Sequence, residues 1–455
     1  MKDSDLEIIY SEDNPAIVKD DLKCIQCGYC VKVCRDEITV AKRYDINKSL
    51  KPICIHCGQC ANMCPTEAIH ERLDYLNLKQ LLKRKDIIKT ISIAPAVRVA
   101  IGEAFSLGED NYEGKIVSFL KELGFDYIFD ITFGADLTIM EETMELVNRI
   151  KNNGTLPMFT SCCPAWVSYA EIFYPNFLPN LSTCKSPITM QSTMIKTYFA
   201  EEKKLDASKI LNVVVAPCTA KKAEIKRDEV NKARDYFKKD DLKDTDYVLT
   251  TRELISLLKE SNIDFKTLSS EEFSSPLGKG SSAGLLFGKT GGVMEAALRS
   301  AYYFLNGKDL EKDAITLQDV RGLEGVREAE VDMGEVTLKV AVVNGIKNVV
   351  HLLEKIEKKE VTYHFVEVMS CSYGCAGGGG QPKLTLLEMK EKKKRRLQSI
   401  EKEDDQAKIR FCHKNPEIEE LYQKFLGKPN SLLAEKLLHT SFKNRSYLLG
   451  GKDHA

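Results

Sequence analysis

Two closely spaced runs of cysteines near the start of the chain restrict its fold more than any other feature. Both follow the pattern C-x2-C-x2-C-x3-C, the first over Cys24–Cys34 and the second over Cys54–Cys64. The chain has fifteen cysteines, and its first residues show no secretory signal pattern. Cysteines grouped in this way favour metal binding over disulfides. We therefore expect residues 1–80 to form a small domain that folds around metal.

The spacing within these runs predicts which metal group they bind. It is typical of bacterial ferredoxins with two 4Fe–4S clusters, in which the fourth cysteine of each run ligates the other cluster. One cluster is then expected on Cys24, Cys27, Cys30 and Cys64, and the other on Cys54, Cys57, Cys60 and Cys34. The alternative is a zinc ribbon, which needs only four thiolates in two C-x2-C knuckles. Eight cysteines in a duplicated unit favour the ferredoxin-like domain.

Three later segments also offer cysteines in what we interpret as loops. They read TSCCPAW at 160–166, APCTAKKAE at 216–224 and EVMSCSYGCAGGGGQP at 367–382. Four consecutive glycines make the last segment a poor helix or strand, because glycine lets the backbone approach a ligand closely and adopt positive φ. We expect this loop to wrap around a bulky non-protein group. One cysteine from each of the first two loops and two from the third would ligate one more iron–sulfur cluster.

The rest of the chain predicts a multidomain protein with an α+β N-terminal domain and a larger α/β region. Short apolar strands alternate with longer helical patterns up to about residue 358, which favours α/β layering over residues 81–385. The clearest predicted strands are 90–95, 124–130, 211–216 and 361–368, and the clearest helices are 97–104 and 137–151. Residues 386–455 are expected to be helical, with the basic run 392–396 on a solvated face.

Charge and hydropathy exclude two classes of partner. The formal net charge is −1, which gives no strong attraction to nucleic acid or to a membrane surface. No apolar run approaches the roughly 20 residues that a membrane span needs. We therefore expect a cytoplasmic protein that binds neither.

The three loops resemble the signature motifs of the iron-iron (FeFe) hydrogenases, which read T-S-C-C-P-x-W, M-P-C-x-x-K-x-x-E and E-x-M-x-C-x-x-x-C-x-x-G-G-G-Q-P. The resemblance extends to FGADLTIMEE at 133–142, RSAYYF at 299–304 and GKTGGVMEAALRSA at 288–301. It implies a two-lobed α/β catalytic domain over 81–385, covered by the helical C-terminal segment.

The resemblance also implies the active-site cofactor. Cys163, Cys218, Cys371 and Cys375 would hold a third 4Fe–4S cluster, and Cys375 would bridge it to a two-iron subsite carrying CO, cyanide and an azadithiolate. Lys221, in the same motif as Glu224, is suited to donate to a cyanide, although a lysine next to Lys222 is in most proteins a surface residue. The wall of the pocket would comprise Ala94, Pro95, Ala96, Ile188, Ala216, Phe287 and Met369.

A proton route is implied as well. In the family, the cysteine at the position of Cys162 exchanges protons with the bridgehead amine, and a thiol with an ordinary pKa near 8.5 suits that role. Glu142, Glu145 and Arg149 are three and four residues apart, so they share one helix face, and Ser182 would supply a hydroxyl between the carboxylates. Without the resemblance, such a trio would be taken for a solvated set of charges. Cys184, Cys412 and the seven histidines show no ligand spacing.

Three positions depart from the family pattern without removing a ligand or a proton station. Ala216 stands where Met is usual, Ile188 where Gln is common, and Ser370 where Ala is common. These departures bear on the catalytic bias and the resting state more than on the reaction.

The resulting hypothesis is a ferredoxin-dependent FeFe hydrogenase, with soluble ferredoxin as electron partner and maturation proteins that insert the diiron subsite. No G-x-G-x-x-G after a strand indicates a nicotinamide or flavin site. The alternatives are a non-catalytic iron–sulfur protein of cytosolic cluster assembly and a hydrogen sensor of the same fold. Cys162, Glu142, Glu145 and Ser182 favour the enzyme, because a scaffold has no need of a proton route. A sensor usually carries an added signalling domain, which the residues after Pro382 do not resemble.

Overall fold

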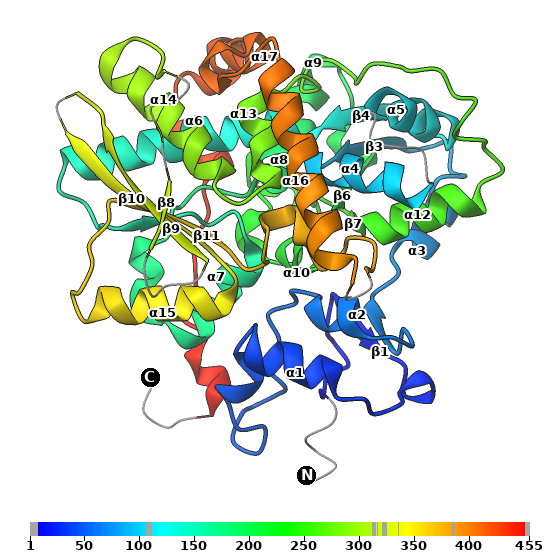
Figure 1. Ribbon diagram of the computed structural model, residues 1–455. Coiled ribbons are helices and arrows are strands. Elements are labelled where there is room, and N and C mark those ends of the chain that lie inside the picture. The colour runs from blue at the N-terminus through cyan, green and yellow to red at the C-terminus, as the bar shows by residue number, and fades with distance from the viewer. Residues whose placement is uncertain are drawn as a thin grey trace.

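The computed structural model describes residues 8–450 except for 106–111, 312–314, 316, 321–324, 335 and 385–386. The predicted boundary between residues 385 and 386 therefore lies outside the described residues. Within them, an N-terminal module, two sheet-centred lobes and a C-terminal helical segment are packed together, with the module below the lobes in the view of Figure 1.

The N-terminal module repeats one small unit. Strand β1 (Ile17–Lys19) pairs antiparallel with β2 (Ile69–Glu71), and helices α1 (Tyr29–Asp36) and α2 (Gln59–Met63) each start inside a cysteine run. Gly28 and Gly58 precede these helices with φ of 76° and 74°, in the left-handed region that glycine adopts most readily. The sequence repeat is therefore also a structural repeat.

The first lobe contains a four-stranded parallel sheet in the order β4-β3-β6-β7. Its strands are β3 (Ile88–Ile93), β4 (Tyr127–Asp130), β6 (Ile210–Ala216) and β7 (Tyr247–Thr250). Its helices are α3 (Tyr75–Leu81), α4 (Pro95–Ala104), α5 (Glu113–Glu122) and α12 (Thr251–Glu260). Every residue of β6 is buried, as expected for a central strand covered on both faces.

The second lobe contains a five-stranded mixed sheet in the order β5-β11-β10-β9-β8. Its strands are β5 (Met158–Phe159), β8 (Gln318–Asp319), β9 (Val326–Asp332), β10 (Thr337–Asn344) and β11 (Phe365–Met369). Strands β5, β11 and β10 are parallel to one another, β9 pairs antiparallel with β10, and β8 pairs antiparallel with β9. Helices α7 (Pro164–Phe173), α14 (Gly292–Asn306) and α15 (Ile346–Glu357) pack around this sheet.

Helix α6 (Ile131–Lys151) is the central helix of the catalytic region, in contact with α8 (Pro187–Met194), α13 (Ser282–Leu285) and α14. It starts six residues before the predicted position, because the side chain of Asp130 accepts from the Thr132 amide and caps it there. Nearly every residue from Ile131 to Val147 is buried, including three glutamates. Apolar periodicity therefore does not identify its inward face.

The C-terminal segment is helical, as predicted, and covers the catalytic region. It comprises α16 (Met389–Gln406), α17 (Pro416–Leu421) and α18 (Leu432–Leu438), and the short helices α9 (Ala200–Glu202), α10 (Ala220–Glu224) and α11 (Ala233–Phe237) complete the fold. Within the basic run, Lys394 and Arg395 are exposed, but the prediction is wrong for Arg396. That side chain is buried, because it bonds both carboxylate oxygens of Glu103 on α4 and the carbonyl of Ala376.

The glycine-rich loop is packed closely against other protein atoms at each of its four consecutive glycines. A Cβ added at Gly377, Gly378 or Gly379 would lie within 2.2 Å of a backbone carbonyl oxygen, and one at Gly380 would lie 2.9 Å from Thr250. At Gly379 the obstructing oxygen belongs to Cys57 of the N-terminal module. The glycines therefore allow the loop to fit between the module and the first lobe, in addition to any group that it encloses.

Arg252 stabilises the contact between the N-terminal module, the glycine-rich loop and the first lobe. Its guanidinium donates to both carboxylate oxygens of Glu71, to Asn62, and to the carbonyls of Gly379 and Gln381. Burial raises the pKa of Glu71, but Arg252 outweighs this and holds the pKa below its ordinary value. One side chain thus connects α12, the N-terminal module and the glycine-rich loop.

We expect Arg252→Gln to lower the free energy of unfolding by about 3 kcal/mol, because it leaves the Glu71 carboxylate buried without its cation. Arg234→Gln is the matched control: Arg234 pairs with the exposed Asp228, so its loss is expected to change stability by less than about 1 kcal/mol. Urea unfolding of the two variants side by side measures the difference. Equal midpoints would mean that the Arg252 network does not hold the module in place.

Candidate active site

The loops that follow β3, β6, β5 and β11 meet between the two sheets and enclose a small apolar cavity of about 90 Å3. All seven predicted wall residues line it, namely Ala94, Pro95, Ala96, Ile188, Ala216, Phe287 and Met369. The cavity is also bordered by Cys162, Cys163, Cys218, Cys371, Cys375 and Lys221. Segments separated by almost 300 residues therefore form one site at the carboxyl ends of parallel strands, where α/β folds commonly bind ligands.

Four of these cysteines lie close enough to perturb one another. Burial raises the pKa of Cys375 to about 12, and the thiols of Cys163 and Cys371 add to the effect. Burial also raises the pKa of Cys218, with contributions from Cys371 and Cys163. Such a set of thiols matches the four-cysteine donor set of a 4Fe–4S cluster, and metal binding would release their protons.

The N-terminal cysteines are also grouped. Burial is the largest cause of the raised pKa of Cys30, and the neighbours Cys27 and Cys64 raise it further. Burial likewise raises the pKa of Cys34, and its first contributing neighbour is Cys54. The fourth cysteine of each run thus lies beside members of the other run, as the crossed arrangement requires. Cys57 is in addition close to Cys371 at the border of the cavity.

Gln59 is a site residue that the sequence analysis missed. Its side-chain nitrogen lies 3.2 Å from the sulfur of Cys371 and 3.1 Å from the carbonyl oxygen of Gly377. It follows Cys57 and Gly58 in the N-terminal run, so its position between two cysteine groups depends on the packing of the module. Ser370, one of the three departures from the family pattern, borders the cavity, and its hydroxyl lies 3.2 Å from the sulfur of Cys163.

Lys221 is buried, which excludes the surface reading of this residue. Its ammonium group donates to the carbonyl of Cys162 at 3.0 Å and to the carboxylate of Glu224 at 2.9 Å. Burial lowers the pKa of Lys221, but the attraction of Glu224 and Cys218 more than offsets this and leaves it raised. Lys222 is buried too and pairs with Asp74 and Glu253. Lys221 therefore stays protonated at the edge of the cavity.

The proposed outer end of the proton route is hydrogen-bonded. The carboxylate of Glu145 accepts from Arg149 at 2.6 Å, from the hydroxyl of Ser182 at 3.1 Å and from the amide of Thr183 at 3.0 Å. Arg149 also donates to the carbonyl of Leu181 at 2.8 Å, among others. The side chains of Glu145 and Arg149 are 11% and 14% exposed, so this end approaches solvent.

Glu142 differs from Glu145 in having no fixed partner. Both of its carboxylate oxygens are buried without a hydrogen bond among the described residues. Burial raises its pKa to about 8, with the charge of Glu145 adding to the shift and the nearby Ser182 offsetting part of it. Burial raises the pKa of Cys162 as well, and Glu142 is the first neighbour that contributes. Glu142 is therefore largely a neutral acid at pH 7, between Ser182 and Cys162.

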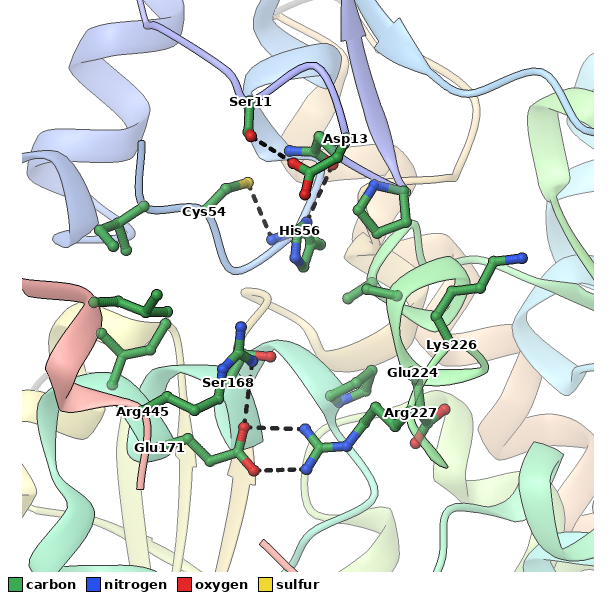
Figure 2. Close-up of a pocket in the computed structure, with 18 of the residues that line it drawn as sticks. Ser11, Asp13, Cys54, His56, Ser168, Glu171, Glu224, Lys226, Arg227 and Arg445 are labelled. Carbon is green, nitrogen blue, oxygen red and sulfur yellow. Dashed lines mark hydrogen bonds and ion pairs between the residues drawn. The ribbon is translucent and has the colours of Figure 1, made fainter. Parts of the chain in front are cut away.

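A second cavity, of about 370 Å3, separates the N-terminal module from the catalytic region (Figure 2). Asp13, Cys54 and His56 face it from the module. On the opposite side, the fully buried carboxylate of Glu171 bonds Arg227 at 2.6 and 3.0 Å and Arg445 at 3.4 Å. Acidic and basic side chains are balanced along this wall, so it does not select for either charge.

Of the helices in the described part of the chain, none combines the length and apolarity required of a membrane span.

Comparison with known proteins assigns the family. Residues 88–379 match the model of the iron only hydrogenase large subunit, C-terminal domain, residues 390–445 that of the iron hydrogenase small subunit, and residues 23–69 that of a 4Fe-4S dicluster domain. Iron hydrogenase 1 of Clostridium pasteurianum is 41% identical over 95% of this chain and 76% of that protein. The NADP-reducing hydrogenase subunit HndD of Solidesulfovibrio fructosivorans is 40% identical over 96% of this chain and 77% of that protein.

The fold agrees with these matches. A solved structure of apo [FeFe]-hydrogenase HydA1 from Chlamydomonas reinhardtii has a TM-score of 0.72 and 36% identity, and the match covers 84% of this chain and all of that chain. A more distant relative, cytosolic iron-sulfur assembly component 3 of Rattus norvegicus, is 32% identical over 77% of this chain and 73% of that protein. The three family matches, in the order and over the segments that the motifs predict, show that the chain belongs to the iron-only hydrogenase family.

Proposed function

We propose that this protein catalyses 2H+ + 2e− ⇌ H2 at a cofactor held between its two lobes. The observation that carries the proposal is the convergence of four thiols and a protonated lysine on one apolar cavity, with a neutral buried acid beside Cys162 at its border. Cys163, Cys218, Cys371 and Cys375 would hold the 4Fe–4S part, and Cys375 would bridge it to the diiron subsite with its CO, cyanide and azadithiolate ligands. When bound, the cofactor supplies the redox-active irons and a basic amine.

The protein's own residues would then position the subsite and exchange its protons. Lys221, held by Glu224, presents N–H groups at the cavity edge, where they suit a cyanide nitrogen. The apolar wall excludes water, so protons reach the cavity through side chains. Cys162 would pass them to and from Glu142, and Ser182, Glu145 and Arg149 would connect Glu142 to the surface.

Electrons would enter through the N-terminal module. Its two cysteine groups would hold two further 4Fe–4S clusters, about fourteen irons in all with the site just described. The proximity of Cys57 to Cys371 supports electron transfer from the second of these groups to the proposed catalytic one. Ferredoxin is the proposed electron partner, and maturation proteins would insert the diiron subsite. A non-catalytic assembly role is the competing function, supported by the rat relative.

Hydrogen production by purified protein tests the proposal. Protein made together with the maturation proteins and kept free of oxygen is expected to evolve hydrogen from both reduced ferredoxin and reduced methyl viologen. Protein made without them should hold about twelve irons and evolve none. Full iron content without hydrogen from either donor would favour the assembly role. Activity with the viologen alone would reject only ferredoxin as partner.

Ala216 offers a test of how the pocket tunes the site. Its methyl group and the side chain of Ile188 both line the cavity. A thioether is larger, polarisable and a weak acceptor, so Ala216→Met is expected to preserve assembly while changing the packing beside the subsite. A change of ~1.4 kcal/mol between two redox or protonation states shifts their populations tenfold. We therefore expect shifted CO bands in the infrared spectrum and an altered ratio of evolution to uptake.

Both forms are compared at the same pH and hydrogen pressure, by infrared spectroscopy and film voltammetry. Ala207→Met is a control for the added side-chain bulk alone, because Ala207 is buried outside the cavity and does not border it. Superimposable spectra and an unchanged ratio for Ala216→Met would show that this position does not tune the site.

A further inference from the structure

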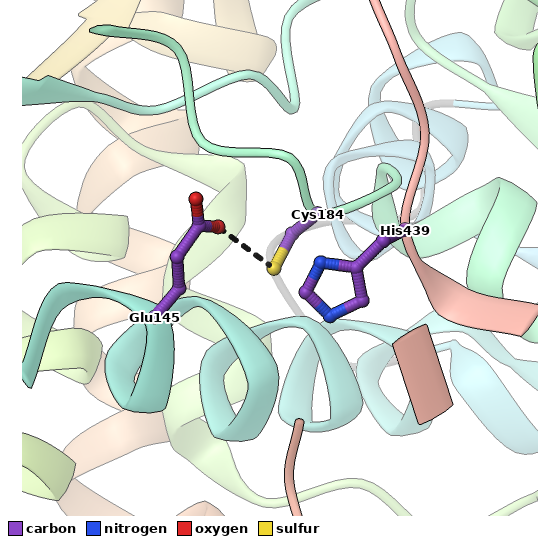
Figure 3. A group of neighbouring side chains, drawn as sticks. All are labelled: Glu145, Cys184 and His439. Carbon is purple, nitrogen blue, oxygen red and sulfur yellow. Dashed lines mark hydrogen bonds between the residues drawn. The ribbon is translucent and has the colours of Figure 1, made fainter. Parts of the chain in front are cut away.

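Three side chains with metal-binding atoms meet beside the proposed proton route. Glu145 comes from α6, Cys184 from the loop before α8, and His439 directly follows α18. One ligand atom from each lies within 4.8 Å of the other two. Figure 3 shows the sulfur of Cys184 between the carboxylate of Glu145 and the imidazole of His439. Cys184 is fully buried, and the side chains of Glu145 and His439 are each 11% exposed.

The surroundings of His439 leave Nδ1 as the ring nitrogen that could ligate a cation in exchange for its hydrogen bond with Thr183. Nε2 lies 3.2 Å from the carboxylate of Glu141, which is fully buried and also accepts from the hydroxyl of Tyr422 and from the amide of Asn430 at 2.8 Å. Because this carboxylate already accepts from two other donors, Nε2 is assigned as the nitrogen that carries the hydrogen. Nδ1 then has a lone pair directed at the hydroxyl of Thr183, 2.7 Å away. A carboxylate that fixes the tautomer of a ligating histidine is a recurrent support of metal sites.

We propose that Glu145, Cys184 and His439 form a binding site for a thiophilic divalent cation such as Zn2+. The set of one thiolate, one imidazole and one carboxylate suits this class of ion, with water or the hydroxyl of Thr183 as fourth ligand. The sulfur of Cys184 lies 3.7 Å from Oε2 of Glu145. Tetrahedral Zn2+ with ordinary bond lengths separates such atoms by about 3.6 Å, so this pair needs almost no rearrangement.

Local charge favours a cation here. Burial raises the pKa of Cys184, and the carboxylates of Glu145 and Glu141 raise it further. The negative potential that opposes a free thiolate attracts a divalent ion, whose binding releases the thiol proton. Arg149 opposes the ion, but it donates to Oε1 of Glu145, whereas Cys184 faces Oε2. The guanidinium contact can therefore persist beside the bound cation.

Occupation of the site would interrupt proton transfer. Oε2 of Glu145 is the atom that accepts from Ser182 at 3.1 Å, and a metal bond to that oxygen competes with the hydroxyl. This consequence rests on the proposed function, because it requires Glu145 to carry protons. Binding of the cation does not depend on that role.

Binding is tested first in protein made without maturation, which cannot turn over hydrogen. Zn2+ is titrated calorimetrically, and zinc and iron per chain are measured after desalting. Cys184→Ser is expected to raise the zinc Kd at least 100-fold and His439→Gln at least tenfold. Glu141→Gln, which removes the acceptor behind the imidazole, should raise it about tenfold.

Cys412→Ser is the matched control, because Cys412 is equally buried and lies outside the cluster, 2.9 Å from the hydroxyl of Ser300. Its zinc Kd should be unchanged. Iron content and melting temperature verify that each variant is folded. If Cys184→Ser does not fold, His439→Gln alone tests the site. A zinc Kd that is the same in Cys184→Ser or His439→Gln as in the wild type, or zinc uptake matched by iron loss, overturns the site.

The matured enzyme then separates the site from its consequence. Zn2+ should inhibit hydrogen evolution, with half-inhibition at a concentration that matches the Kd measured by calorimetry. The Cys184→Ser variant should turn over normally and should not be inhibited at that concentration. If zinc binds through these residues without lowering turnover, the metal site stands and the proton route through Glu145 is wrong. If zinc does not bind, the site is wrong and the route is untouched.

Discussion

Cys162→Ala is expected to lower hydrogen evolution and uptake at least 100-fold while the iron content stays unchanged. Cys162 borders the cavity, and Glu142 is the first titratable neighbour of its thiol. A methyl group neither accepts nor donates a proton, and losing a positioned acid–base group typically costs 10²- to 10⁴-fold in rate. The neighbouring Cys163 leaves the cluster with its four thiolates. Hydrogen production and uptake, together with iron per chain, measure the effect.

Two further variants sharpen this experiment. Cys162→Asp should retain more activity than Cys162→Ala, since a carboxylate can still relay protons. Cys412→Ala, at a buried cysteine remote from the cavity, should keep near-normal turnover. Loss of about four irons in Cys162→Ala would mean that Cys162 is the ligand and Cys163 the proton station.

Glu142→Gln is expected to lower turnover to a similar extent and to change how stability depends on pH. The amide has the shape of the carboxyl group but cannot exchange the proton. The pKa of Glu142 is raised to about 8 in the folded chain. Between its ordinary value of about 4.3 and 8, the folded state thus holds a proton that the unfolded state has lost. This group therefore makes the wild type progressively less stable as pH rises through that window.

The glutamine variant lacks this titration, so its stability relative to the wild type should increase from about pH 5 to about pH 8 and then level off. Urea unfolding at several pH values measures the difference. Glu391→Gln, on the exposed face of α16, is the control and should show no such trend. A constant difference between Glu142→Gln and the wild type would mean that Glu142 is ionised in the folded protein at neutral pH.

The sequence predicted well those features that local spacing determines. The three loop motifs contain the cysteines and the lysine that border the cavity, and the structure brings to it all seven wall residues that the family resemblance implies. Four predicted strands were found within four residues of their predicted bounds, namely β3, β4, β6 and β11. Their apolar runs and the residues that end them are local features of the sequence. Domain boundaries and ligand sets remain predictions.

Contacts between residues far apart in the chain could not be predicted from the sequence. Helix α6 reads as amphipathic but is buried on nearly all sides, so its glutamates are inside the protein. Arg396 belongs to a basic run, yet its partner Glu103 lies almost 300 residues earlier in the chain. His439 and Cys184 show no ligand spacing, because a distance of 255 residues is closed only by the fold. Each of these features depends on tertiary contacts that residue patterns do not encode.

Infrared spectroscopy of the matured protein tests the central claim most directly, since bound CO and cyanide absorb where proteins do not. If the four-cysteine site holds a diiron subsite, protein made with the maturation proteins will show CO and cyanide stretching bands that respond to hydrogen, and protein made without them will show none. Matured protein with a full complement of iron and no such bands would contradict the assignment of this cavity as the site of hydrogen chemistry.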